Sequence, residues 1–361
     1  MKTIHVALPE KNYSVHIEPG ILSHLGAWVA KIWTPRQIAV ISDSHVAPLY
    51  QEQVIAQLSG AGFHVTAYVV PAGEASKNWM ETIRLYRKLM NDHFQRTDGI
   101  LALGGGVVGD LAGFVASTYM RGLALIQIPT SLLAQVDSSV GGKTAIDLDT
   151  GKNLVGTFYQ PDAVFIDPDL LATLPQRYLA EGYAEVVKMA ALSGNGFWAL
   201  MEQINRPEDI LKHAEALIEQ SVAFKAEVVI DDEKESGRRQ ILNFGHTIGH
   251  AIELLAQGKL AHGEAVSIGM VQLSGLFEKY RLSPPGTAAM LTSRLRAAGL
   301  PVASSLIGTA DFYEKVKNDK KNRSGRLNLV YLQALGQPAL YPIPGDQARL
   351  FFSGRMPEPK R

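Results

Sequence analysis

The chain has 361 residues, of which 46% are hydrophobic and 19% charged, and its 35 Lys and Arg balance its 35 Asp and Glu. This length accommodates two domains, and the zero net charge gives no support for a nucleic-acid or membrane-surface partner, although a local cationic pocket is compatible with it. The sequence has no cysteine, so disulfides and thiolate metal sites are excluded and any metal must be held by His, Asp or Glu.

The first residues, MKTIHVALPEKNYSVHI, alternate apolar and polar side chains, which is typical of strands and not of a signal peptide. No stretch offers the ~18 consecutive apolar residues of a membrane span. The most apolar region, residues 99–122, is interrupted by glycines, Asp110 and Arg121. We therefore expect a cytoplasmic enzyme that binds neither a membrane nor a nucleic acid.

Strand and helix patterns alternate through the first half of the chain. Helical patterns at 46–59 and 79–91 separate strand-like runs, which are RQIAVISD, FHVTAYVV, GILAL, LALIQIPT and DAVFIDP. Strands separated by helices of this length predict a mostly parallel sheet that is covered on both faces. The first domain is therefore expected to have an α/β fold.

A glycine-rich turn, LALGGGVVGDLAGF at 101–114, follows one of these strands and opens a helix. Glycines let the backbone approach a phosphate closely, and a helix N-terminus supplies free N–H groups. The spacing departs from G-x-G-x-x-G, so a tight packing turn is the alternative to phosphate or dinucleotide binding. Asp43 ends an earlier strand, where it could hold ribose hydroxyls or equally cap a helix.

After about Pro175, long helical patterns dominate, at 177–192, 207–229, 239–255 and 264–279. We place the boundary near 174–178, which predicts an α/β domain at 1–176 and a mostly α-helical domain at 177–361.

Arg239, Asn243, His246 and His250 share one face if residues 239–255 form a continuous helix. Burying such a polar stripe is costly unless a ligand or neighbouring groups satisfy it, and a hydrogen-bonded pair of core histidines is the alternative. HGEAV adds His262, and AEVVK adds Glu185 and Lys188. Two histidines and one carboxylate form the pattern of a catalytic divalent metal site with open positions, for which zinc is suited.

Several blocks occur in order, namely GGGVVGDLAGF, PTSLLAQVDSSVGGKTAIDLDTGKN, FYQPDAVFID, AEVVK, FKAEVV, LNFGHTIGHAIE, HGEAV and DKK. Together they closely resemble the 3-dehydroquinate synthase family between about Asp43 and Lys321. The resemblance implies a Rossmann-like dinucleotide-binding domain, a helical metal- and substrate-binding domain, and a homodimer. It also implies an NAD- and zinc-dependent conversion of a sugar phosphate, 3-deoxy-D-arabino-heptulosonate 7-phosphate, into 3-dehydroquinate and phosphate.

The resemblance assigns roles to individual residues. Glu185, His246 and His262 are the implied ligands of a divalent metal, zinc or alternatively cobalt. The implied NAD contacts are Asp43, Glu74, Lys77, Gly105, Gly106, Val107, Val108, Gly109, Asp110, Thr130, Ser131, Lys143, Lys152, Asn153, Leu170 and Thr173. The implied substrate and catalytic residues are Asp137, Lys143, Asn153, Lys188, Lys225, Arg239, Asn243, His250 and Lys320, the last preferred to Lys321.

The resemblance implies two further roles, one in the assembly and one in proton transfer, and the sequence departs from the family pattern at one noted position. Arg121 is expected to reach the pocket of the neighbouring subunit, and Glu235 and His250 resemble the family's proton-transfer pair. Asp147 stands where the family often has Asn.

Three alternatives to this activity remain at this point. Another sugar phosphate cyclase would use the same cofactor, but SSVGGKTA, Arg239 and DKK favour a substrate that carries a carboxylate. A metal-dependent polyol dehydrogenase would release NADH, whereas the synthase should show no net cofactor reduction. A non-catalytic NAD- or metal-binding regulator would have no need for His250, Glu235 and so many cations.

Overall fold

The computed structural model describes residues 1–149, 151–317, 322–323 and 326–355. The chain forms two compact units, unit 1 with residues 1–174 and 214–234, and unit 2 with residues 175–213 and 235–361. The chain first passes between the units after Leu174. The predicted domains, 1–176 and 177–361, differ from the units mainly in residues 214–234, which group with unit 1.

Unit 1 is built on a seven-stranded sheet with the order β1-β2-β9-β6-β5-β3-β4. The strands are β1 (Lys2–Ala7), β2 (Asn12–Ile17), β3 (Gln37–Asp43), β4 (His64–Val70), β5 (Gly99–Gly104), β6 (Ala124–Pro129) and β9 (Ala163–Ile166). β1 pairs antiparallel with β2, and all other neighbours pair parallel. The predicted, mostly parallel sheet is confirmed.

The strand order reverses beside β3, because β4 lies on one side of it and β5 on the other. Open parallel sheets bind ligands outside the carboxyl ends of the strands at such a reversal. Asp43 ends β3 and Gly104 ends β5, so the topology brings the carboxyl ends of these two strands to the reversal.

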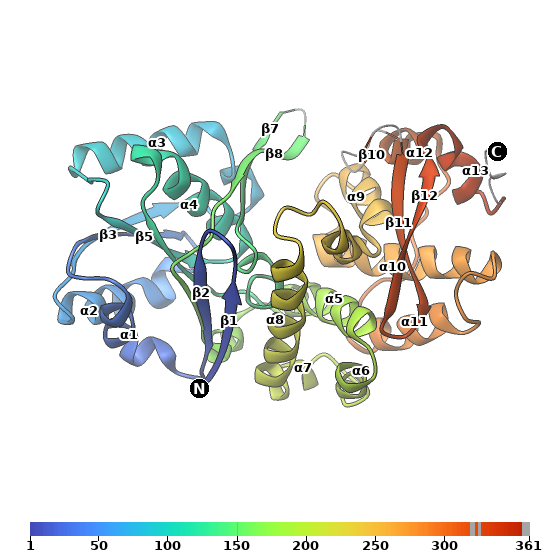
Figure 1. Ribbon diagram of the computed structural model, residues 1–361, viewed down its shortest axis with the longest axis horizontal. Helices are drawn as coiled ribbons and strands as arrows, with labels where there is room; N and C mark the ends of the chain where they lie inside the picture. The colour runs from blue at the N-terminus through green and yellow to red at the C-terminus, as the bar shows by residue number, and fades with distance from the viewer. Residues whose placement is uncertain (150, 318–321, 324–325, 356–361) are drawn as a thin grey trace. The chain divides into compact units, whose positions relative to one another are not determined.

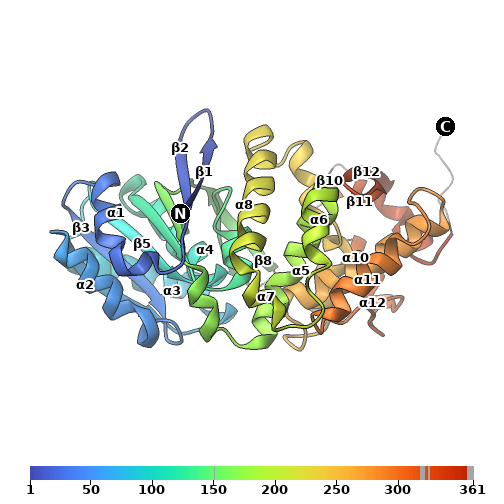
Figure 2. The same cartoon turned by 90° about the horizontal axis from the view of Figure 1, so that it is seen from below.

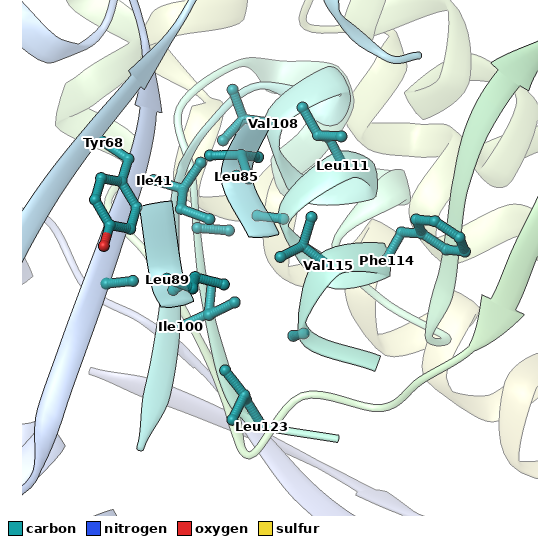
Figure 3. Close-up of a cluster of buried hydrophobic side chains, with 14 of the residues drawn as sticks. Ile41, Tyr68, Leu85, Leu89, Ile100, Val108, Leu111, Phe114, Val115 and Leu123 are labelled. Carbon is teal, nitrogen blue, oxygen red and sulfur yellow. The ribbon is translucent and has the colours of Figure 1, made fainter. Parts of the chain in front are cut away.

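Helices cover both faces of this sheet (Figure 1). They are α1 (Leu25–Ile32) and α2 (Glu52–Gly60) on one face, and α3 (Trp79–Asn91) and α4 (Gly106–Thr118) on the other. Alternate residues of β3 enter the two cores: Ile38 and Val40 pack with α1 and α2, and Ile41 packs with α3 and α4 (Figure 3). The continuous apolar runs of the sequence therefore correspond to strands that are buried on both faces.

Two further elements of unit 1 depart from the sequence-based expectations: the hairpin at 143–158 was not predicted, and the helix predicted at 207–229 was expected in the second domain. An antiparallel hairpin joins β7 (Lys143–Leu148) to β8 (Gly151–Phe158). The helix α8 (Ala214–Asp231) packs against β1 and against η5 (Ala134–Ser138), and both figures of the whole chain place α8 beside β1 (Figures 1 and 2).

Unit 2 is mostly helical, as predicted. Its helices are α5 (Gln176–Ser193), α6 (Asn195–Met201), α7 (Asp209–Lys212), α9 (His246–Leu255), α10 (His262–Lys279), α11 (Thr287–Ala297), α12 (Ala310–Lys317) and α13 (Ala348–Phe352). Its sheet contains β10 (Asn322–Arg323), β11 (Arg326–Ala334) and β12 (Gln337–Pro344). No helix within the described ranges has both the length and the apolar character that a bilayer crossing requires.

The predicted continuous helix over residues 239–255 is wrong. A short 3-10 helix, η7 (Arg238–Asn243), ends before Phe244, and α9 starts anew at His246. Gly245 between them has φ 80°, and a Cβ there would lie 2.6 Å from Cγ of Met270. The left-handed backbone and the close approach of α10 both require glycine at this position. As a result, His246 begins a helix instead of lying in the middle of one.

Candidate functional site

The three predicted metal ligands converge within unit 2, where they come from three helices. Glu185 lies on α5, and His246 and His262 are the first residues of α9 and α10. Oε1 of Glu185 lies 3.6 Å from Nε2 of His246 and 3.4 Å from Nε2 of His262. Two donors of a tetrahedral zinc ion, each about 2 Å from the metal, lie about 3.3 Å apart. The donor set therefore fits one small divalent cation, and the three ligand atoms lie within 4.8 Å of one another.

The second nitrogen of each ligand histidine contacts an oxygen. Nδ1 of His246 lies 3.1 Å from the backbone oxygen of Phe244, and Nδ1 of His262 lies 3.1 Å from Oε2 of Glu253. Burial alone would lower the pKa of His262, but the adjacent carboxylates of Glu185 and Glu253 raise this pKa to about 10. Because a metal competes with that proton for the ring, metal binding at this site releases protons.

A buried cation adjoins the metal ligands. Lys188 follows Glu185 by one helical turn, its ammonium pairs with Oε2 of Glu185, and the residue is 1% exposed. Glu185 therefore directs one oxygen at the two histidines and the other at the ammonium of Lys188. Burying either charge alone would be costly, and their pairing offsets that cost.

The remaining predicted residues of unit 2 lie on η7, on α9 and in the loop before η7. The ring of His250 lies 5.3 Å from that of His246 and 5.8 Å from that of His262, measured between centroids. Asn243 donates a hydrogen bond to Oε1 of Glu235 at 2.7 Å. Arg239 is 1% exposed, although it lies on η7 and not on the helix that carries the histidines. The stripe predicted from helical spacing therefore does not form, because the helix is interrupted between Asn243 and His246.

In unit 1, the predicted glycine-rich turn starts a helix as expected. Gly105 is the N-cap of α4, which begins at Gly106. A Cβ on Gly105 would lie 3.4 Å from Oγ of Ser131, and one on Gly106 would lie 3.1 Å from Oγ of Ser138. Val107, Val108 and Gly109 form the first turn of α4, with Val108 buried in the core. The N-terminus of α4 therefore presents free N–H groups beside small hydroxyl side chains.

A lysine surrounded by carboxylates lies next to this turn. Nζ of Lys77 lies 3.1 Å from Oε1 of Glu74 and 3.2 Å from Oδ2 of Asp110, with Oδ1 of Asp147 at 3.9 Å. Lys77 is 4% exposed, and although burial lowers its pKa, the carboxylates raise it overall. Burial raises the pKa of Asp110 to about 6, although Lys77 opposes this shift. Lys152 approaches Glu74 from the β7–β8 hairpin at 3.8 Å.

Other predicted cofactor residues have local structural partners. Oδ1 of Asp43 accepts hydrogen bonds from the backbone N–H groups of His45 and Val46 in the turn after β3, and the short helix that follows has no side-chain cap, so the capping alternative is wrong. The hydroxyl of Thr173 lies 2.6 Å from that of Tyr50, near Leu170 in the short helix η6 (Pro168–Thr173). Thr130 is buried directly after β6, and Oγ of Ser131 accepts from the N–H of Ala134.

The predicted substrate residues of unit 1 form one ion pair and one hairpin cluster. Lys225 of α8 pairs with both the side chain and the backbone oxygen of Asp137. Lys143 begins β7 and is exposed, while Asn153 has φ 54° and donates its N–H to Oδ1 of Asp147. Arg121 is exposed in the turn η4 (Tyr119–Arg121), where its φ is 65°. Lys320 and Lys321 lie outside the described residues.

Two residues near the predicted sites were not assigned a role from the sequence. Glu253 contacts His262, and Asp147 joins the carboxylates around Lys77. Glu253 ends the block LNFGHTIGHAIE one turn after His250, which was a usable signal. Asp147 was singled out only as a departure from the family pattern.

Known proteins resemble this chain over most of its length. The family model described as 3-dehydroquinate synthase N-terminal matches residues 67–181, and the model described as 3-dehydroquinate synthase C-terminal matches residues 182–322. A 3-dehydroquinate synthase of Latilactobacillus sakei is 55% identical over 347 residues, which cover 96% of this chain and 97% of that protein.

Two solved structures resemble the fold over nearly the whole chain. A 2-deoxy-scyllo-inosose synthase, complexed with carbaglucose-6-phosphate, NAD+ and Co2+, has a TM-score of 0.87 and 27% identity, with 98% of this chain and 100% of that chain covered. A 2-epi-5-epi-valiolone synthase of Streptomyces hygroscopicus, with NAD+ and Zn2+ bound, has a TM-score of 0.85 and 26% identity, with 96% of this chain and 98% of that chain covered.

Proposed function

The chain belongs to the 3-dehydroquinate synthase family, and from that premise we propose which of its residues carry the family's reaction. The enzyme is a phosphate-eliminating lyase that converts 3-deoxy-D-arabino-heptulosonate 7-phosphate into 3-dehydroquinate and phosphate. The observation that carries the proposed site is the meeting of Glu185, His246 and His262 from three separate helices. The sugar phosphate cyclases of similar fold, with NAD+ and Co2+ or Zn2+ bound, support NAD and a divalent ion as cofactors.

In unit 2, Glu185, His246 and His262 would hold the divalent ion, and in unit 1 the N-terminus of α4 would hold the dinucleotide. When bound, NAD takes up and returns a hydride at a substrate carbon, while the ion polarises the oxygen on that carbon. Glycines at the start of α4 let the pyrophosphate approach the backbone N–H groups. Lys77 and Lys152 balance the carboxylates that line the same segment, so an anionic dinucleotide meets a local surface that is not purely acidic.

The cationic residues bind the anionic groups of the substrate. Arg239 carries a planar guanidinium that can take a carboxylate with two parallel hydrogen bonds. Lys188, next to the metal ligand Glu185, holds an electronegative oxygen of the substrate close to the ion. Lys225 is already fixed by Asp137, so it offers a charge of defined position to the phosphate.

Proton transfer is assigned to residues that adjoin the ligand histidines. His250 lies one turn after His246 on α9, and its imidazole has two nitrogens that can donate or accept a proton, so it suits proton transfer beside the ligand histidines. The hydrogen bond from Asn243 holds Glu235 in a defined rotamer, which suits a carboxylate that assists proton transfer. Elimination requires a base to remove one proton from the substrate, and the departing phosphate can itself accept that proton.

The assembly and the location are proposals of a different kind. Exposed apolar side chains on η4 and on the β7–β8 hairpin, namely Met120, Leu148, Leu154 and Phe158, support self-association through unit 1. We assign Arg121 to the site of the partner in a homodimer. A charged dinucleotide and a sugar phosphate do not cross a bilayer unaided, which supports a cytoplasmic location.

A mixing experiment tests the assignment of Arg121. In a heterodimer of Arg121→Ala and His246→Ala subunits, one of the two sites has an intact metal set and receives Arg121 from the partner. Random mixing of two individually inactive variants should therefore restore up to about a quarter of the wild-type activity. Mixtures that stay inactive although heterodimers form would remove Arg121 from the partner's site.

The activity itself is tested with the purified chain, the heptulosonate phosphate, catalytic NAD and zinc. We expect phosphate and 3-dehydroquinate in equal amounts, without a net rise in NADH absorbance. The His246→Ala variant should be inactive, and the matched control His64→Ala, an exposed histidine of β4, should be fully active. Steady accumulation of NADH would identify a dehydrogenase instead, and phosphate release without dehydroquinate would identify a different cyclase.

A further inference from the structure

The two ligand histidines are held by different acceptors. Nδ1 of His246 contacts the backbone oxygen of Phe244, which is two residues earlier in its own chain segment. Nδ1 of His262 instead contacts the carboxylate of Glu253, which comes from the neighbouring helix α9. The ring of His262 therefore lies between two carboxylates, with Nε2 at 3.4 Å from Glu185 and Nδ1 at 3.1 Å from Glu253.

This arrangement fixes which nitrogen of His262 is available to a metal. A neutral imidazole carries one N–H and one lone pair, and a carboxylate can accept only the N–H. The contact with Glu253 therefore places the hydrogen on Nδ1 and directs the lone pair of Nε2 towards Glu185 and His246. An anionic acceptor also increases electron density on the ring and strengthens the Nε2 donor.

The two ligand histidines differ in exposure, and the more exposed one, His262, is the one that contacts a carboxylate. The side chain of His246 is 10% exposed, whereas that of His262 is 27% exposed. A more exposed ring competes with water for its orientation and is held less firmly by packing. The side chain of Glu253 is only 12% exposed, so its charge acts on the ring with little screening.

Glu253 is not required to pair α9 with α10. The two helices touch through their backbones, because a Cβ on Gly249 would lie 3.2 Å from the carbonyl carbon of Ala265, and one on Gly269 would lie 2.0 Å from the oxygen of Gly245. Small residues therefore already set the approach of the two helices, and the carboxylate adds an orientation that packing does not supply.

We infer that Glu253 is a positioning residue of the metal centre, which orients His262 and raises the affinity of the site for a divalent cation. The inference rests on the proposed metal site. With a divalent ion bound, Glu185 and Lys188 cancel each other and leave the positive charge of the ion. The carboxylate of Glu253 offsets part of that charge, so it favours the metal-bound state over the metal-free one.

The test is the zinc dissociation constant of the metal-free full-length chain, measured by competition with a chromophoric chelator at fixed pH. Glu253→Ala should weaken zinc binding about 10- to 100-fold, the range typical for loss of such a contact. Glu253→Gln should weaken it less, by about threefold or more, because an amide oxygen still accepts the N–H but carries no charge.

Glu181→Gln is the matched control. Glu181 lies one turn before Glu185 on α5 and interacts electrostatically with His262, but its hydrogen bond goes to the backbone N–H of Gly263. An amide can replace it there, so zinc affinity should stay within about twofold of wild type. With cobalt as the probe, the visible absorption bands of Glu253→Ala should shift in position, because the orientation of one ligand has changed, and those of Glu181→Gln should not.

Each outcome decides between explanations. Wild-type affinity in Glu253→Ala would overturn the inference, and an equal loss in Glu181→Gln would reduce Glu253 to one of several nearby charges and overturn it as well. If Glu253→Ala fails to fold, judged by thermal unfolding of the metal-free chain, Glu253→Gln decides in its place, and wild-type affinity there overturns the inference. A wild-type chain that binds no zinc would instead contradict the proposed metal site itself.

Discussion

Unit 1 and unit 2 each bury a lysine that faces carboxylates, but the surroundings of the two ammonium groups differ. Lys77 of unit 1 is surrounded by Glu74, Asp110 and Asp147, which come from three segments of the chain. Lys188 of unit 2 pairs with Glu185 on the same helix, and the other oxygen of Glu185 faces two histidines. In unit 1 the charge of Lys77 balances several acidic groups. In unit 2 the carboxylate of Glu185 contacts the ammonium of Lys188 with one oxygen and faces the proposed metal site with the other.

This difference predicts how each cluster responds to the loss of a partner. The unit 1 cluster should behave as a structural ion-pair network whose stability depends on pH. The unit 2 cluster should behave as a metal centre whose stability depends on the concentration of the ion. The four predictions below separate these two behaviours, beginning with the largest expected effect.

Glu185→Gln should produce the largest change, because it removes the carboxylate that faces both histidines and Lys188. We expect loss of bound zinc and a fall in turnover of at least about 10³-fold, corresponding to about 4 kcal/mol of lost transition-state stabilisation. Metal content after dialysis and dehydroquinate formation measure the two effects. Retention of one zinc per chain would show that Glu185 is not a ligand.

Replacement of each buried lysine by Met should give the next largest effect and the sharpest contrast. Lys188→Met leaves the buried carboxylate of Glu185 without its cation, so we expect the metal-free protein to lose about 2–4 kcal/mol of unfolding free energy, and Lys77→Met should lose somewhat less because its carboxylates are only partly buried. Relative to wild type at the same zinc concentration, saturating zinc should recover much of the loss in Lys188→Met, since the ion also neutralises Glu185, and should leave the loss in Lys77→Met unchanged. Urea unfolding with and without zinc measures this, and equal responses in the two variants would contradict the comparison.

Asp110→Asn should change the pH dependence of stability. Burial raises the pKa of Asp110 to about 6, above its ordinary value near 4, so the folded state binds a proton that the unfolded state has already lost between these pH values. The contribution of Asp110 to stability is therefore present at pH 4 and decreases as the pH rises to 6. As the pH rises from 4 to 7, the unfolding free energy of the variant should therefore increase by about 1–3 kcal/mol relative to that of the wild type. Parallel stability curves for the two proteins would exclude this role.

Asp147→Asn should have the smallest effect. The amide oxygen can still accept the N–H of Asn153, and the lost charge lies 3.9 Å from Lys77, farther than the charges of the other two carboxylates. We expect a change of less than about 1 kcal/mol in thermal unfolding. Asp149→Asn, an exposed residue of the same hairpin, is the matched control and should leave the transition unchanged. A loss as large as that of Lys77→Met would assign Asp147 a structural role equal to that of the lysine.

The parts of the fold that the sequence predicted are those encoded locally. The strands of unit 1 follow from β-branched runs, and the turn before α4 follows from consecutive glycines after a strand. The metal set was also predicted, although its residues are up to 77 positions apart in the numbering, because each lies inside a block of the family pattern. Glu185, His246 and His262 lie close together in the structure, as a set of metal ligands requires.

The parts that were not predicted depend on contacts between distant segments. Helical spacing could not reveal the break at Gly245, because the reason for it is the approach of Met270 from α10. The pairing of Glu253 with His262 likewise needs two helices to be placed side by side. The grouping of α8 with unit 1 arises from its contacts with β1 and η5, which are far from it in sequence.

The proposed metal centre of unit 2 holds one divalent ion through two imidazole nitrogens and one carboxylate. Zinc K-edge X-ray absorption of the loaded chain counts those ligands directly. We predict two imidazoles per zinc at about 2.0–2.1 Å, reduced to one in His262→Ala and unchanged in His250→Ala. A wild-type spectrum without imidazole scattering, or one that loses an imidazole when His250 is replaced, would contradict the assignment.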